Sequence, residues 1–99
     1  FDVVVDDRSC YLADGTRAGT VLAGSILAMD EAIRNLVQHA GCALAEALPT
    51  VTTTPADAVG AGAERARIQA GFVADLVLLS ADLHVHTTIA AGQVVYRAT

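Results

Sequence analysis

A glycine-punctuated run between residues 12 and 30 constrains the fold more than any other part of this chain. It contains two glycine-bearing turns and a loop of small residues, and it leads directly into an amphipathic pattern. Ser25, at the end of the loop, is a residue type that often begins a helix by accepting a hydrogen bond from a free amide. We therefore expect exposed amides at the positive end of a helix, which suits polar or anionic small molecules. Three glycines could adopt a positive φ or let another molecule approach the backbone: Gly15, Gly19 and Gly24.

Three helices are expected after this loop. Apolar residues at helical spacing predict the first helix over 26–37. A second helix is expected over 42–48, and it should end early because Pro49 follows at once and proline removes a helical hydrogen bond. A third helix should begin with Thr54 as its N-cap and stop at Gly60.

Strands are expected at both ends of the chain. Residues 1–5 and 10–12 are apolar and partly β-branched, which predicts a first antiparallel pair. The nearly unbroken apolar run 75–79 predicts a strand buried on both faces. Residues 85–97 predict a terminal hairpin that turns at 91–92. The segment is therefore expected to be α+β.

Charge and cysteine content exclude several classes of function. The net charge is −5, and the six cationic residues are all arginines scattered along the chain. No basic stripe is available for nucleic acid or anionic lipid. No run of about 18 apolar residues appears, so a membrane is not an expected partner. Nucleic acid is not an expected partner either, because the basic stripe is missing. Cys10 and Cys42 are far apart and outside any CxxC motif, which favours free thiols over a disulfide.

The side chains that could carry chemistry are few. His84 and His86 would project from the same side of a strand, as two metal ligands can. The alternation with their apolar neighbours places both imidazoles in water, and no third histidine or nearby cysteine completes a site. Asp6 and Asp7 are adjacent, so on a strand they would face opposite sides rather than form a general acid/base pair. His39 is expected at a helix C-terminus, where a cation interacts favourably with the helix dipole.

The run Leu22-Ala23-Gly24-Ser25, followed by Met29, resembles the segment after the last barrel strand of N-acetylglucosamine-6-phosphate deacetylases. The resemblance covers nearly the whole chain, and a strand motif shared by many amidohydrolases forms part of it. The matching segments are three helices at 32–37, 44–48 and 54–56 and that strand at 71–79. This family tends to carry a glycine just before residues 67–68, where this chain has Ala66, so the turn there departs from the family pattern.

The resemblance implies a division of the chain into three parts. Residues 1–24 would be strands and a substrate-side loop, residues 25–60 the last helices of a (β/α)₈ barrel, and residues 61–99 strands of the accessory β-sandwich. A barrel alone takes about 250 residues, so we expect the C-terminal piece of a larger enzyme. The alternative is a complete small protein. Asp75 would be a structural residue that accepts hydrogen bonds from turn amides.

The resemblance also implies an activity. The parent enzyme would hydrolyse N-acetylglucosamine 6-phosphate to glucosamine 6-phosphate and acetate in the cytoplasm, as a homodimer. A divalent metal, zinc or iron, would activate water, and a carboxylate would relay the proton to the leaving amine. The family's metal ligands and catalytic Asp lie upstream of Phe1, so the segment would be inactive alone, with no catalytic or metal-binding residue of its own. Its substrate-binding residues would be Leu22, Ala23 and Gly24, which border the amino-sugar pocket.

Two alternatives remain open. Another amidohydrolase, such as a dihydroorotase-like or imidazolonepropionase-like enzyme, would share residues 74–76 and the terminal hairpin but would not need the Leu22–Met29 pattern. A non-enzymatic accessory module would have to fold cooperatively by itself and bind a protein partner.

Overall fold

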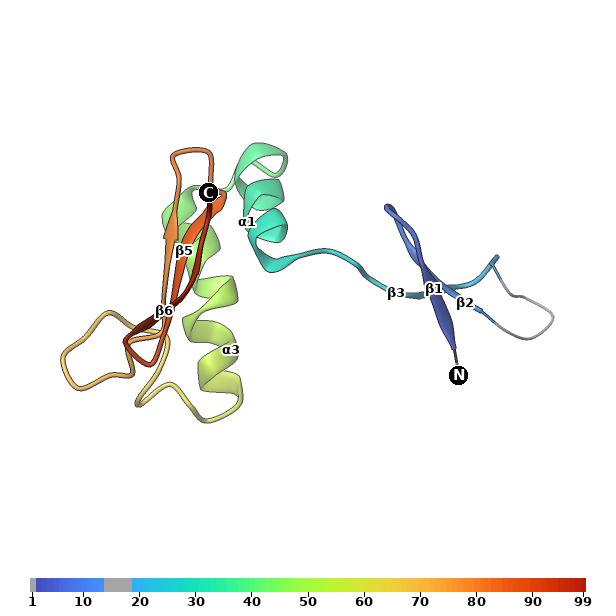
Figure 1. Cartoon of the computed structure of the whole chain (residues 1–99). Helices are drawn as coiled ribbons and strands as arrows, with labels where there is room; N and C mark the ends of the chain where they lie inside the picture. The colour runs from blue at the N-terminus through green and yellow to red at the C-terminus, as the bar shows by residue number, and fades with distance from the viewer. Residues whose placement is uncertain (1, 14–18) are drawn as a thin grey trace.

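The computed structural model of the chain describes residues 2–13 and 19–99, and these form two small sheets with helices between them in sequence (Figure 1). The N-terminal sheet is antiparallel, with strand order β1-β2-β3. Its strands are β1 (Val3–Val5), β2 (Cys10–Leu12) and β3 (Leu22–Gly24). Figure 1 shows this sheet held away from the helices by an extended segment, 25–28. The strands predicted within 1–5 and at 10–12 are confirmed for the described residues.

Hydrogen bonds to one aspartate side chain form the turn between β1 and β2. The Oδ1 atom of Asp6 accepts hydrogen bonds from the backbone N–H groups of Arg8 and Ser9, both at 2.8 Å. In this pattern the aspartate side chain accepts the hydrogen bonds that a backbone carbonyl accepts in an ordinary turn. Asp6 therefore closes the β1–β2 hairpin.

The first helix begins later than the sequence predicts. Helix α1 runs over Met29–Gln38 with Ala28 as its N-cap residue, and no side chain caps it. The prediction that the helix starts at Ser25 is wrong. The Oγ of Ser25 instead accepts a hydrogen bond from the Leu27 N–H at 3.0 Å and closes a separate turn. The helix is anchored by Ile33, which is only 4% exposed.

The next helical segment is broken, as Pro49 predicts. Helix α2 (Leu44–Ala47) is followed directly by the 3₁₀ helix η1 (Leu48–Val51), which has the proline in its first turn. Helix α3 (Thr53–Ala58) comes next. The predicted Thr54 N-cap is wrong: the N-cap residue is Thr52, whose hydroxyl donates back to the Leu48 carbonyl at 2.8 Å and so caps nothing.

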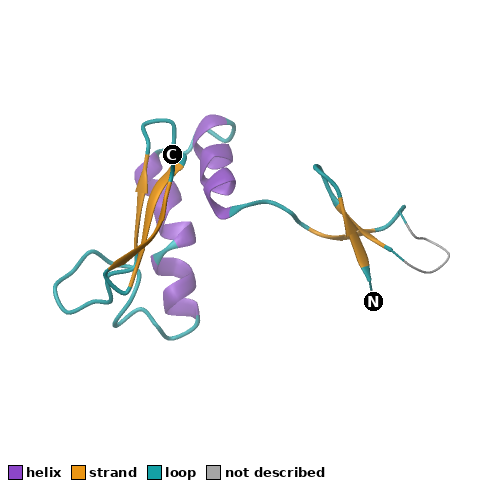
Figure 2. Cartoon of the chain, viewed as in Figure 1, coloured by secondary structure: helices purple, strands orange, loops and turns teal. Residues whose placement is uncertain are grey.

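The C-terminal half forms the second sheet (Figure 2). Its strands β4 (Leu76–Leu79), β5 (Val85–Ala90) and β6 (Gln93–Arg97) are antiparallel neighbours in sequence order. The predicted hairpin turn is confirmed, since Ala91 and Gly92 have φ values of 48° and 80°. Two consecutive positive φ angles are typical of a type I′ turn, whose twist matches that of the strands.

Little of the chain is buried. Among the described residues the buried side chains are Ile33, Ala47 and Thr87. The prediction that residues 75–79 are buried on both faces is wrong for this chain, because Val77 and Leu78 are 56% and 48% exposed. No helix in the described part of the chain is long and apolar enough to cross a membrane. The α+β class is confirmed.

Candidate functional site

The three predicted substrate-binding residues form a strand rather than a free loop. In β3, Leu22 pairs with Tyr11 and Gly24 with Cys10, and an irregularity in the register lies between these two pairs. The strand order places β3 at one edge of the sheet. Among the described residues, no strand covers its other side. An edge strand presents backbone N–H and C=O groups that can bind another molecule.

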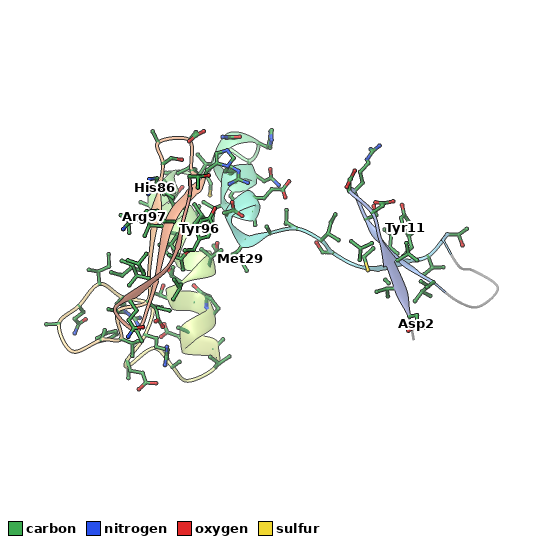
Figure 3. All side chains as sticks on the ribbon, viewed as in Figure 1. Asp2, Tyr11, Met29, His86, Tyr96 and Arg97 are labelled. Carbon is green, nitrogen blue, oxygen red and sulfur yellow. The ribbon has the colours of Figure 1, made fainter. Side chains whose placement is uncertain are left out.

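A hollow of about 860 Å³ lies beside this strand. It is lined by the β1–β2 turn, by β3 and the segment after it, and by the first turn of α1; the residues are Asp7, Arg8, Ser9, Leu22, Ala23, Gly24, Ser25, Ile26, Leu27 and Glu31. All three predicted residues therefore lie together. In Figure 3, Tyr11 marks the sheet and Met29 marks the start of α1, at the two ends of the extended segment.

Of the charged residues of this hollow, the sequence pattern singled out Asp7 only as part of an acid/base pair, which was rejected, and it did not point to Arg8 or Glu31. Asp7 and Arg8 come from the hairpin turn, and Glu31 comes from α1. The predicted pairing between residues 3–5 and 10–12 locates the turn that contains Asp7 and Arg8. The sequence did not predict that β3 pairs with β2, and this pairing brings the turn next to Gly24. The rim therefore carries two carboxylates and one guanidinium.

The two explanations offered for Gly24 can now be separated. Gly19 has a φ of 72°, whereas Gly24 does not adopt a positive φ. A Cβ atom added to Gly24 would meet nothing within 4 Å. The contacts within the described part of the chain therefore impose no need for glycine at this position. Gly15 lies outside the described residues.

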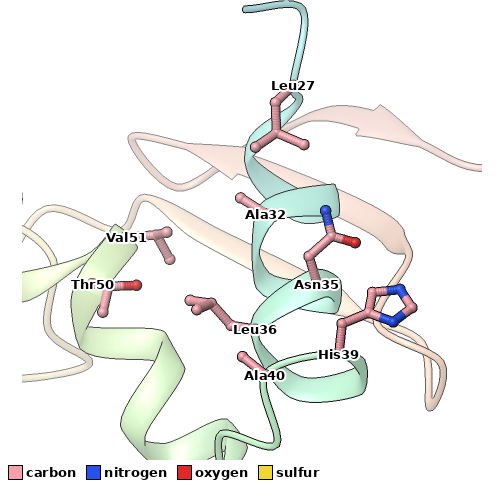
Figure 4. A pocket seen from close by; sticks show the side chains of 8 residues that line it. All are labelled: Leu27, Ala32, Asn35, Leu36, His39, Ala40, Thr50 and Val51. Atoms are coloured by element: carbon pink, nitrogen blue, oxygen red, sulfur yellow. The ribbon is translucent and has the colours of Figure 1, made fainter. Parts of the chain in front are cut away.

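A second hollow, of about 580 Å³, lies between α1 and η1 (Figure 4). Apolar side chains such as Leu36 and Val51 dominate its lining, and His39 lies at its edge. His39 is the C-cap residue of α1, which confirms its predicted place at a helix end. No carboxylate lines this hollow, so its described residues offer no acid/base pair.

The histidine pair of the C-terminal sheet is exposed, as predicted. His84 Nε2 lies 3.7 Å from Asp82 Oδ2, and His86 Nδ1 lies 2.8 Å from Thr87 Oγ1. Within residues 2–13 and 19–99, no group of three His, Cys, Asp or Glu residues is arranged to hold a metal ion. The described residues therefore offer no ligand set for a divalent metal. Cys10 and Cys42 are free and half-buried.

Asp75 has the structural role predicted for it. Its Oδ1 accepts the Ala91 N–H at 2.8 Å, and its Oδ2 accepts a hydrogen bond from Arg65 Nη1 at 2.6 Å. The adjacent Ala74 carbonyl accepts the Gly92 N–H at 2.9 Å. These bonds fasten the start of β4 to the β5–β6 turn, so Asp75 shapes the sheet.

An ion pair on α1 lowers the pKa of one carboxyl group, that of Asp30. Arg34 Nη1 lies 2.7 Å from Asp30 Oδ2, one helical turn away. The hydrogen bond from Arg34 is the main cause that holds the pKa of the Asp30 carboxyl below its ordinary value. The same nitrogen donates to the carbonyl oxygen of Leu83 at 3.0 Å.

Comparisons with known proteins agree on one group of enzymes. The model of the amidohydrolase family matches residues 4–95. The chain is 35% identical over 97 residues to N-acetylglucosamine-6-phosphate deacetylase from Homo sapiens, a match that covers 98% of this chain and 23% of that protein. The enzyme of the same name from Bacillus subtilis is 32% identical, with 95% of this chain and 22% of that protein covered.

Solved structures give the same picture. The crystal structure of N-acetylglucosamine-6-phosphate deacetylase from Thermotoga maritima matches with a TM-score of 0.78 and 38% identity, over 97% of this chain and 25% of that one. The enzyme from Pasteurella multocida matches with a TM-score of 0.80 and 30% identity, over 93% and 23%. The chain thus spans a quarter or less of the length of these relatives.

Proposed function

Because the chain belongs to the amidohydrolase family, and its resemblance to N-acetylglucosamine-6-phosphate deacetylases is confirmed, we propose that it is part of such a deacetylase. The complete enzyme hydrolyses N-acetylglucosamine 6-phosphate to glucosamine 6-phosphate and acetate. The observation that carries the proposal is the combined likeness in sequence and structure to deacetylases over 97% of the chain.

Within this enzyme, we propose that Leu22, Ala23 and Gly24 form one wall of the amino-sugar pocket. Two features support this role. The strand lies at a sheet edge beside a hollow of about 860 Å³, and Gly24 leaves open space where a side chain would otherwise stand. A backbone that lies open in this way can be approached closely by a polar ligand.

The larger architecture is part of the same proposal. Residues 25–60 supply the last barrel helices, residues 61–99 supply strands of the accessory sandwich, and residues 1–24 supply the substrate-side strands. The exposed apolar side chains of β4, such as Val77 and Leu78, support burial against further parts of the enzyme. The zinc or iron ion, the homodimer and the cytoplasmic location belong to the complete enzyme, and no described residue supplies a step through the metal.

The experiment is a substitution at Gly24 in the complete enzyme. Gly24→Val should fold normally, since the described residues leave room for its Cβ. Its side chain would project into the space that the substrate needs. We expect kcat/KM to fall about a hundredfold, equivalent to about 2–3 kcal/mol of transition-state stabilisation, while metal content stays unchanged.

The matched control is Ala70→Val, which adds bulk at an exposed turn in the other half of the chain. It should leave the kinetics unchanged. If Gly24→Val also keeps wild-type kinetics, β3 is only a connection to α1 and the assigned pocket wall is wrong. A wild-type enzyme that cleaves a cyclic amide but not the acetamide would instead favour the dihydroorotase-like alternative.

A further inference from the structure

Arg34 joins two parts of the molecule that are far apart in sequence. Its side chain is only 17% exposed, and one nitrogen, Nη1, donates two hydrogen bonds to other described residues. One bond goes to Asp30 in the first turn of α1, and the other goes to the carbonyl of Leu83, 49 residues away. Leu83 lies in the turn between β4 and β5. Arg34 therefore fastens α1 to the C-terminal sheet.

The turn that contains Leu83 holds this carbonyl in a fixed direction. Leu83 has a φ of 65°, and its N–H donates to the Ser80 carbonyl at 2.9 Å. The hydroxyl of Ser80 accepts the His84 N–H at 3.1 Å and donates to Asp82 Oδ1 at 2.5 Å. A non-glycine residue keeps a positive φ only where surrounding bonds enforce it. The acceptor for Arg34 is thus part of a hydrogen-bonded turn.

The other end of this connection lies at the hollow beside β3. Helix α1 packs against α2 and η1, and its first turn contributes Glu31 to the hollow. Leu27, in the segment just before the helix, contributes to the same wall. Glu31 lies one helical turn from Arg34, so a change in the direction of α1 would move the wall relative to Gly24.

We propose that Arg34 is a positioning residue for this hollow: by holding α1 against the β4–β5 turn, it sets the direction in which the first turn of α1 presents Glu31 to the hollow. Its kinetic consequence rests on the proposed deacetylase function. The residue does not touch the substrate, and it acts through the helix that carries the wall.

The kinetic test compares three variants of the complete enzyme with N-acetylglucosamine 6-phosphate as substrate. Arg34→Gln should raise KM about tenfold with kcat within about twofold, because binding is lost while the reacting groups are unchanged. Arg34→Lys should return KM to within about threefold of wild type, since a single nitrogen makes both contacts. The control is Arg67→Gln, which removes an ion pair with Asp57 at 3.3 Å, away from the hollow. A lower kcat with unchanged KM, or an effect equal to that of the control, would overturn the proposal.

A second measurement does not depend on activity. Hydrogen exchange in peptides spanning 25–33 should become faster in Arg34→Gln and stay at the wild-type rate in Arg67→Gln. Equal exchange in Arg34→Gln and wild type would refute the positioning role. If Arg34→Gln does not fold, Asp30→Asn removes the charged partner that holds the Arg34 side chain in place for its bond to the Leu83 carbonyl, and it should raise exchange in the same peptides. A wild-type enzyme that does not deacetylate the substrate would refute the proposed function, whereas hydrogen exchange would still decide the role of Arg34.

Discussion

Ala66 offers a test of backbone strain. This alanine has a φ of 68°, in the left-handed region that favours glycine. The turn around it is held from both sides: the Glu64 carbonyl accepts the Val73 N–H at 2.9 Å, and Arg65 pairs with Asp75 at 2.6 Å. For a residue with a Cβ, this conformation costs about 1–2 kcal/mol. Ala66→Gly should remove that strain.

The net effect is smaller than the strain. Glycine gives the unfolded chain more freedom, which offsets about 0.4–1 kcal/mol of the gain. The difference between the central values predicts that Ala66→Gly raises the free energy of unfolding by about 0.8 kcal/mol. In urea, with a slope of about 2 kcal/mol/M, the midpoint should rise by about 0.3–0.5 M.

The matched control makes the same chemical change at a helical position. Ala45 lies in α2 and is exposed, so Ala45→Gly should lower the unfolding free energy by about 1 kcal/mol through helix propensity alone. The two variants should therefore shift the urea midpoint in opposite directions. A midpoint for Ala66→Gly that falls as it does for Ala45→Gly would mean that Ala66 is unstrained.

Three further predictions concern stability and association. Asp75→Ala should lower the unfolding free energy by about 1–2 kcal/mol. Asp75→Asn should lower it less, because it keeps an acceptor for the Ala91 N–H, and equal losses in the two variants would contradict this. Because the folded-state pKa of Asp30 is lowered, the stabilisation by its carboxylate is full above the unfolded-state pKa and is lost as the pH falls through the folded-state pKa. Unfolding curves of wild type and Asp30→Asn should therefore converge in acid, and a difference independent of pH would exclude this linkage. The 99-residue chain alone should self-associate in sedimentation experiments through its exposed apolar side chains, whereas a monomer with one sharp thermal transition would favour an accessory module.

The sequence predicted elements where a local pattern determines them. The hairpin at Ala91–Gly92 requires two positive φ angles, and glycine at the second position makes that turn favourable. The early end of the second helix follows from the missing N–H of Pro49. The family resemblance alone predicted that Asp75 accepts hydrogen bonds from turn amides, and the structure identifies the Ala91 N–H as one donor.

The errors have physical causes that a local pattern does not contain. Ser25 uses its hydroxyl to close a separate turn, and Thr54 lies inside α3 rather than at its N-cap, so the residue type alone did not locate the helix starts. Leu22–Gly24 looked like a loop because small residues are poor strand formers, and pairing with β2 overrode that preference. The exposure of β4 depends on what packs against it, and the hydrophobic run alone does not specify that partner.

The bond from Arg34 to Leu83 also bears on how the chain folds. It closes a loop of 49 residues, whereas the bond from the Ala91 N–H to Asp75 closes one of 16. Loop closure costs more entropy as the loop lengthens, so the C-terminal meander can form early and the link from Arg34 forms late. An interaction absent from the transition state changes the unfolding rate and leaves the folding rate nearly unaltered. We therefore expect substitutions of Arg34 to change the unfolding rate of the chain more than its folding rate.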